Sequence, residues 1–192
     1  MFHVYMKHKV ENLPTNIRNI EIENDIDPQL FDVFKMCIIL DNGNDIRAIG
    51  PFTKFHAFIY LQFSEYFWEY KYYLLSELHK NILSYMITEF SSVDEFNKFF
   101  YQKRLIVMYY LEHTFSFNEL VYLYIQTSFG ADKEKSIDEV SLDFFGKRVN
   151  QLNEKEMIIL YLSTRLPYKK ENGSEKYEKQ IQKYLEGFNQ GG

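Results

Sequence analysis

The stretch FKMCIILDNGN, Phe34–Asn44, decides which fold the sequence predicts. Its first part, Phe34–Leu40, is a short and nearly continuous apolar run, which is typical of a buried strand. Asn42 and Gly43 follow this run, and both residue types readily adopt positive φ, so the pair favours a tight β-hairpin turn. The returning strand is then expected at Ile46–Ile49.

Two further strands are predicted on the N-terminal side of this run. Phe2–Val10 (FHVYMKHKV) alternates apolar and polar residues, and Ile17–Glu23 alternates less strictly. Asn24–Pro28 has the composition of a turn. Residues 1–52 are therefore expected to form a small N-terminal antiparallel sheet.

Helices are predicted for the remainder of the chain. Ser or Asn followed three residues later by Glu forms a capping box, which marks a helix start, at 92–95, 116–119, 136–139 and 153–156. The expected helices cover 54–62, 65–90, 93–113, 117–130, 137–150, 154–167 and 175–186. Strands followed by helices predict an α+β fold with a small N-terminal antiparallel sheet and a mostly helical body.

The length of 192 residues suits one domain. A β-rich portion is expected at 1–52 and a helical portion, packed with it, at 53–167. Residues 168–192 are expected to form a linker, a charged helix and a frayed tail.

The charge and the single cysteine limit the classes of function. The net charge of -5 disfavours direct or sequence-specific nucleic acid binding and favours a basic protein partner. Cys37, the only cysteine, is predicted to be a small buried side chain in a reducing compartment. No apolar run approaches the roughly 20 residues of a membrane span, and the N-terminal MFHVYMKHKV carries charges where a signal peptide needs an apolar core. A cytoplasmic protein without a membrane partner is expected.

Aromatic residues are crowded between Phe52 and Phe129, in a chain that is 18% aromatic. On helical wheels, two neighbouring helices each carry apolar side chains outside their main apolar arc. Such a second stripe either packs inside the fold or contacts a partner. The predicted partner-binding residues are Tyr66, Tyr70, Tyr73, Tyr101, Leu105 and Tyr109.

Residue patterns for catalysis are sparse. The sequence contains no HExxH pair, no glycine-rich phosphate loop and no GxSxG motif. We therefore expect no cofactor, no metal and no enzymatic activity. Four carboxylates, Glu21, Glu23, Asp25 and Asp27, leave open a metal-dependent enzyme as an alternative.

The opening segment MFHVYMKHKVENLPTNIRNI, together with the 23.2 kDa size and the acidic composition, resembles small early proteins of staphylococcal phages. Among these, the chain is similar to phage inhibitors that bind the C-terminal domain of the host primary sigma factor. The resemblance implies a non-enzymatic regulator in the host cytoplasm that binds RNA polymerase through its sigma factor. It would block promoters that need upstream DNA contacts. A phage anti-defence inhibitor that binds a host nuclease effector is the other alternative.

Overall fold

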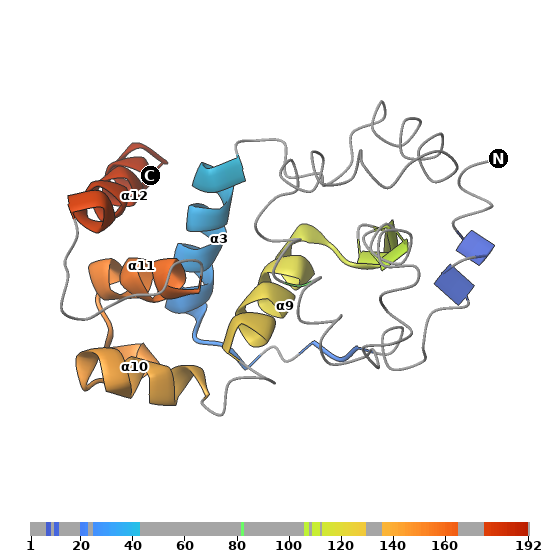
Figure 1. Ribbon diagram of the computed structural model, residues 1–192, viewed down its shortest axis with the longest axis horizontal. Coiled ribbons are helices and arrows are strands. Elements are labelled where there is room, and N and C mark those ends of the chain that lie inside the picture. Colours follow the sequence, from blue (N-terminus) through green and yellow to red (C-terminus); the bar gives the residue numbers. More distant parts are fainter. Residues whose placement is uncertain are drawn as a thin grey trace. The chain divides into compact units, whose positions relative to one another are not determined.

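The computed structural model describes residues 7–8, 10–11, 20–22, 25–42, 82, 106–107, 109–111, 113–129, 136–164 and 175–191 (Figure 1). Most of these residues are helical, and none of them lies in a strand. The described part of the chain is therefore mostly helical. The predicted α+β fold with an N-terminal antiparallel sheet is wrong.

The chain divides into two compact units. Unit 1 comprises Met1–Ile22 and Asp45–Leu120, and unit 2 comprises Glu23–Asn44 and Val121–Gly192. The predicted portions 1–52, 53–167 and 168–192 stay a prediction. In chain order, the described elements include α3 (Pro28–Asn42), α9 (Phe117–Phe129), α10 (Ile137–Phe145), the 3-10 turn η1 (Val149–Gln151), α11 (Glu154–Ser163) and α12 (Glu175–Gly191).

Helix α3 occupies the stretch that was predicted to be a strand and a hairpin. The Leu30 N–H donates to Asp27 Oδ1 at 3.0 Å, and the Phe31 N–H donates to the Asp27 carbonyl oxygen at 3.0 Å. Asp27 is therefore an N-cap. Pro28 follows at the first helical position, where its missing N–H costs nothing.

The burial pattern of α3 explains the error. Its buried side chains recur three and four residues apart, which is the helical period: Leu30, Phe31, Val33, Phe34, Cys37 and Ile38. The seven residues of Phe34–Leu40 are too few to separate a buried strand from a buried helix. Asn42 belongs to the helix, while Gly43 and Ile46–Ile49 lie outside the described residues. Cys37 is fully buried, as predicted.

The predicted strand Phe2–Val10 is also wrong where the structure describes it. Lys7, His8, Val10 and Glu11 are helical. His8 Nδ1 lies 3.7 Å from Glu11 Oε2. Side chains three residues apart are neighbours on a helical turn, whereas in a strand they point to opposite faces. The alternation of apolar and polar residues over so short a segment is a weak predictor of a strand.

The capping boxes correctly located three helix starts. The Ser116 N–H donates to Glu119 Oε2 at 2.6 Å, and the Glu119 N–H donates back to Ser116 Oγ at 3.4 Å. The same reciprocal bonds open α10 and α11. The box at 92–95 and the helices predicted over 54–105 lie outside the described residues, apart from helical Ile82.

Three helix ends differ from the prediction, and the first is that of α11, which ends at Ser163 and not at 167. Helix α10 stops at Phe145 because Gly146 adopts φ 68°, and the Gly146 N–H donates to the Leu142 carbonyl oxygen at 2.8 Å. Helix α12 continues to Gly191, so the tail predicted to be frayed begins as helix.

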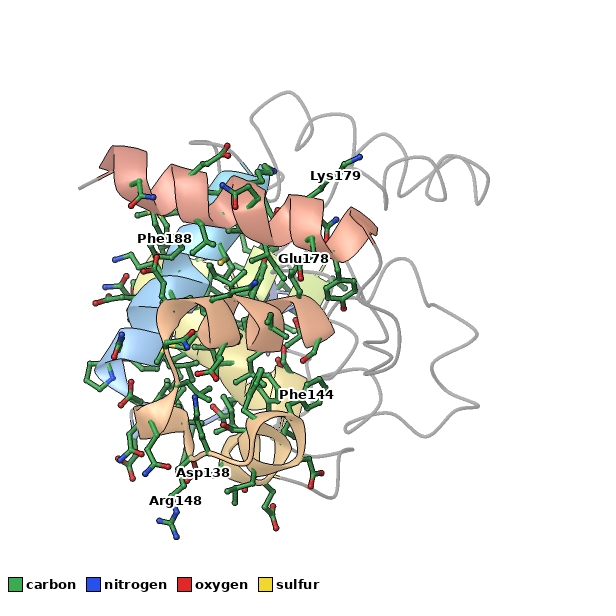
Figure 2. All side chains as sticks on the ribbon, turned by 90° about the vertical axis from the view of Figure 1, so that its left-hand side faces the viewer. Asp138, Phe144, Arg148, Glu178, Lys179 and Phe188 are labelled. Atoms are coloured by element: carbon green, nitrogen blue, oxygen red, sulfur yellow. The ribbon has the colours of Figure 1, made fainter. Side chains whose placement is uncertain are left out.

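Unit 2 is built around aromatic rings. Helix α11 packs against α3 and α12, and α12 also packs against α3 (Figures 1 and 2). Phe34, which is fully buried, places its ring centre 5.3 Å from that of Tyr161 and 6.1 Å from that of Phe129. Such edge-to-face pairs stabilise a core beyond the area that they bury. Gly187 of α12 lets the backbone approach Leu40, because an added Cβ would lie 2.6 Å from Leu40 Cδ1.

Candidate functional site

Tyr109 is the one predicted partner-binding residue that the structure describes. Its side chain is 5% exposed, and its ring stacks on that of exposed His113 with centroids 3.9 Å apart. His113 Nδ1 lies 2.8 Å from the Tyr109 carbonyl oxygen, and burial raises the pKa of the Tyr109 phenol. This ring belongs to the packed interior of unit 1.

The other five predicted partner-binding residues lie outside the described part of the chain: Tyr66, Tyr70, Tyr73, Tyr101 and Leu105. The binding role assigned to the six residues stays a prediction.

The acidic cluster at 21–27 is described in part. Asp27 uses one carboxylate oxygen to cap α3, as given above, and Glu23 lies outside the described residues. Within the described ranges, no three His, Cys, Asp or Glu side chains are grouped so that they could hold a metal ion. The metal-dependent alternative stays a prediction.

Among the described residues of unit 2, the Asp41 carboxylate accepts hydrogen bonds from two tyrosines that are distant from it in the sequence. The Tyr161 hydroxyl donates to Asp41 Oδ2 at 2.5 Å, and the Tyr184 hydroxyl donates to Oδ1 at 2.7 Å. Through these two bonds, the carboxylate joins α3, α11 and α12. No local sequence pattern signals this cluster, because the partners are 120 and 143 residues away from Asp41.

The position of Asp41 explains why it needs two donors. It lies in the last turn of α3, where the partial negative charge of the helix end disfavours a carboxylate. Hydrogen bonds to an ionised acceptor are stronger than neutral ones and offset this cost. Tyr161 is fully buried and Tyr184 is 2% exposed, so both hydroxyls are held against the carboxylate by the packing of their rings. The cluster is suited to fastening helices.

The hydroxyls of Thr164 and Tyr124 also fasten two helices to each other. Thr164 Oγ1 donates to the Tyr161 carbonyl oxygen at 2.7 Å, and it lies 2.7 Å from the Tyr124 hydroxyl. With its proton on the carbonyl, the Thr164 hydroxyl accepts from Tyr124. The C-terminus of α11 is thereby tied to α9.

Helix α10 differs from its neighbours in how little apolar surface it buries. Ser141 is its one fully buried residue, while Ile137, Val140, Phe144 and Phe145 are half-buried. Leu142 is 45% exposed, and no other large hydrophobic side chain of the described residues is as exposed. The sequence analysis did not predict the exposure of Leu142, because it followed the segment richest in aromatic residues and not α10, which buries little apolar surface.

Polar contacts fix α10 at both ends. The capping box of Ser136 and Glu139 begins it, and Gly146 ends it. Ser141 Oγ donates to the Lys147 carbonyl oxygen at 2.7 Å. Asp138 Oδ1 accepts the Val149 N–H at 3.0 Å, which joins the start of α10 to η1.

The turn after α10 is joined to α11 by an ion pair. Lys147 Nζ lies 2.6 Å from Glu156 Oε1. The bond from Lys147, together with the Asn153 N–H, lowers the pKa of the Glu156 carboxyl from its usual value. Figure 2 shows α10 and the neighbouring turn, with Asp138, Phe144 and Arg148 labelled.

Among the described residues, no helix is both long enough and apolar enough to cross a bilayer. Comparisons of the chain with models of known protein families, with curated proteins and with solved structures find no match.

Proposed function

We propose that the chain is a non-enzymatic, phage-encoded protein that inhibits or modulates host transcription by binding the C-terminal domain of the RNA polymerase sigma factor. The observation that carries the non-enzymatic part is the use of buried and half-buried polar groups among the described residues. Tyr161 and Tyr184 donate to Asp41 and so join α11 and α12 to α3, and buried Ser141 donates to the Lys147 carbonyl oxygen in the turn after α10. Groups committed in this way hold a scaffold and are poorly placed to act on a substrate.

The charge supports a basic partner. The chain carries a formal charge of -5, and a DNA-binding domain of a sigma factor presents cationic side chains to phosphates. Opposite charges on two surfaces speed association and favour the correct orientation. The identity of the partner rests on the resemblance of the opening segment to phage sigma-factor inhibitors.

A direct binding measurement tests the proposal. The full chain is immobilised, and the purified C-terminal domain of the staphylococcal primary sigma factor is passed over it at rising salt concentrations. We expect saturable binding that weakens as ionic strength rises, because exposed charge pairs are screened. Absence of binding at low salt would contradict the proposal.

Transcription assays separate this function from the anti-defence alternative. Purified holoenzyme is assayed on one promoter that needs upstream contacts of the sigma factor and on one promoter that does not. The proposed function predicts that the chain inhibits only the first. An anti-defence inhibitor would leave both unaffected and would instead restore phage plating on a host that carries the nuclease effector.

A further inference from the structure

We propose that α12 is a releasable strap on unit 2, which detaches from α3 and α11 while these two helices stay packed together. Helix α12 (Glu175–Gly191) packs against both of them (Figure 2). Elements that bury few apolar side chains open at a lower free energy than the core of the same protein. The inference concerns unit 2 alone and does not depend on the proposed function.

The first argument is the small apolar surface through which α12 is attached. Among its described side chains, those that are buried form a single stripe with spacings of four and three residues: Tyr177, Ile181 and Tyr184. Helix α11 is shorter and yet has five buried side chains: Met157, Ile158, Leu160, Tyr161 and Leu162. A helix of this length is marginal by itself in water, so α12 depends on this stripe.

The second argument is an unsatisfied acceptor in the packed side of α12. Gln180 Oε1 is buried and, in the part of the chain that the structure describes, has no hydrogen-bond partner. A buried carbonyl oxygen without a donor has lost its hydration and gained no bond in exchange, which disfavours the docked helix. When α12 detaches, water reaches this oxygen and the cost is removed. Gln180 therefore favours release.

The third argument is the glycine at which α12 meets α3. An added Cβ at Gly187 would lie 2.6 Å from Leu40 Cδ1, so the glycine permits the close approach of the two helices. Glycine in a helix interior also disfavours the helix, because its backbone loses the most freedom. The same residue thus fits the docked helix to α3 and weakens the helix after release. Helix α12 is stable chiefly while it is docked.

Directional contacts oppose release. The Tyr184 hydroxyl donates to Asp41 Oδ1 at 2.7 Å, and the Tyr184 ring packs edge-on against Tyr161 with centroids 5.8 Å apart. Lys155 Nζ lies 3.5 Å from Glu178 Oε2, but both side chains are half exposed or more, so this ion pair adds little. Release breaks these contacts and exposes the side of α3 and α11 that α12 covers.

Native-state hydrogen exchange of the full chain at rising urea concentrations tests the inference. Amides in the middle of α12 report its release, and amides of α3 and α11 report the opening of unit 2. We expect the α12 amides to exchange about tenfold faster or more. Their exchange should also depend less on urea, because release exposes less surface than unfolding of the unit.

Tyr124→Phe decides whether release is a separate event. It removes a bond between α9 and the end of α11, which persists when α12 alone detaches. We expect exchange in α3 and α11 to become about fivefold faster, and exchange in α12 to change less than about twofold. Tyr184→Phe removes a contact that is lost in both kinds of opening, so it should accelerate exchange in all three helices about tenfold.

Gln180→Met tests the unsatisfied acceptor. Methionine is similar to glutamine in length and helix propensity but has no carbonyl oxygen to bury. We expect exchange in all three helices to become about fivefold slower, because the docked state no longer carries the cost of that oxygen. The matched control, Gln182→Met, makes the same replacement at an exposed position of α12 and should change exchange less than about twofold.

Three results would overturn the inference. The first is an equal exchange rate and urea dependence in α12, α3 and α11, and the second is equal acceleration of α12 and α3 by Tyr124→Phe. The third is exchange in Gln180→Met that is no slower than in Gln182→Met, including failure of Gln180→Met to fold. The sigma domain is absent from all of these measurements, so the strap and the proposed function stand or fail separately.

Discussion

Replacing Tyr161 with Phe tests whether the Asp41 carboxylate fastens the helices of unit 2. The substitution removes only the hydroxyl that donates to Asp41 Oδ2 at 2.5 Å. It leaves the ring that packs edge-on against Phe34, with centroids 5.3 Å apart. Any loss of stability therefore reports the hydrogen bond and not the packing.

The expected magnitude follows from the charge and the burial of the partners. A hydrogen bond to an ionised acceptor contributes about 1.5–3 kcal/mol, against about 1 kcal/mol for a neutral pair. Asp41 is half-buried and keeps the Tyr184 hydroxyl at 2.7 Å, so water and the second donor recover part of the loss. We expect Tyr161→Phe to lower the free energy of unfolding of unit 2 by about 2 kcal/mol.

Two matched substitutions calibrate this value. Tyr124→Phe removes a neutral hydroxyl pair with Thr164 and should cost about 1 kcal/mol. Tyr122→Phe keeps the ring that stacks on Phe31, with centroids 4.3 Å apart, and should cost less than about 0.5 kcal/mol. We therefore predict that the loss of stability falls in the order Tyr161→Phe, Tyr124→Phe, Tyr122→Phe.

Native-state hydrogen exchange is the appropriate assay because the chain has two compact units and a single melting curve would mix them. Peptides from α3 and α11 report the opening free energy of unit 2. If Tyr161→Phe costs no more than Tyr122→Phe, the assignment of Asp41 as a fastening group is refuted.

Three other predictions concern the caps, an ion pair and the predicted stripe. Gly146→Ala should lower the opening free energy of unit 2 by about 1 kcal/mol in native-state hydrogen exchange, and Gly146→Asn by less, because φ is 68° and an added Cβ would meet nothing within 4 Å; equal stability of the three chains would contradict this. The pKa of Glu156 is lowered in the folded state, so its contribution is present above the unfolded pKa of about 4.3 and is lost as pH falls through the folded pKa. Glu156→Gln should therefore lose less stability than wild type between about pH 5 and pH 3, and an equal loss in the two chains would contradict the contribution of Glu156. Tyr109→Ala should lower the stability of unit 1 by about 3 kcal/mol in hydrogen exchange because its side chain is 5% exposed, and an unchanged exchange rate would show that the ring is not part of the interior.

Local signals in the sequence were reliable where the physics is local. A Ser or Asn with Glu three residues later forms hydrogen bonds within one turn, so the starts of α9, α10 and α11 were predictable. The strand predicted at Phe34–Leu40 failed because a short apolar run is compatible with both periods. The decisive cap, Asp27 followed by Pro28, was interpreted as a turn.

Other features could not be predicted because they depend on distant residues. Asp41 meets Tyr161 and Tyr184 across 120 and 143 residues, and no local pattern encodes that meeting. The exposure of Leu142 was equally inaccessible, since it depends on which of the surrounding helices fail to cover α10. The prediction of partner-binding residues followed the aromatic composition and therefore included Tyr109, whose side chain is buried in the fold.

The order of segments in unit 2 has a consequence for synthesis on the ribosome. Unit 2 is assembled from Glu23–Asn44 and Val121–Gly192, with all of residues 45–120 translated in between. At about 5–20 residues per second, the Tyr184 hydroxyl follows Asp41 out of the ribosome by roughly 7 to 30 seconds. During that interval the apolar side of α3, including Phe34 and Cys37, has no native cover from α11 or α12. The nascent chain thus exposes an apolar surface early, and this surface is covered only when the last helix is complete.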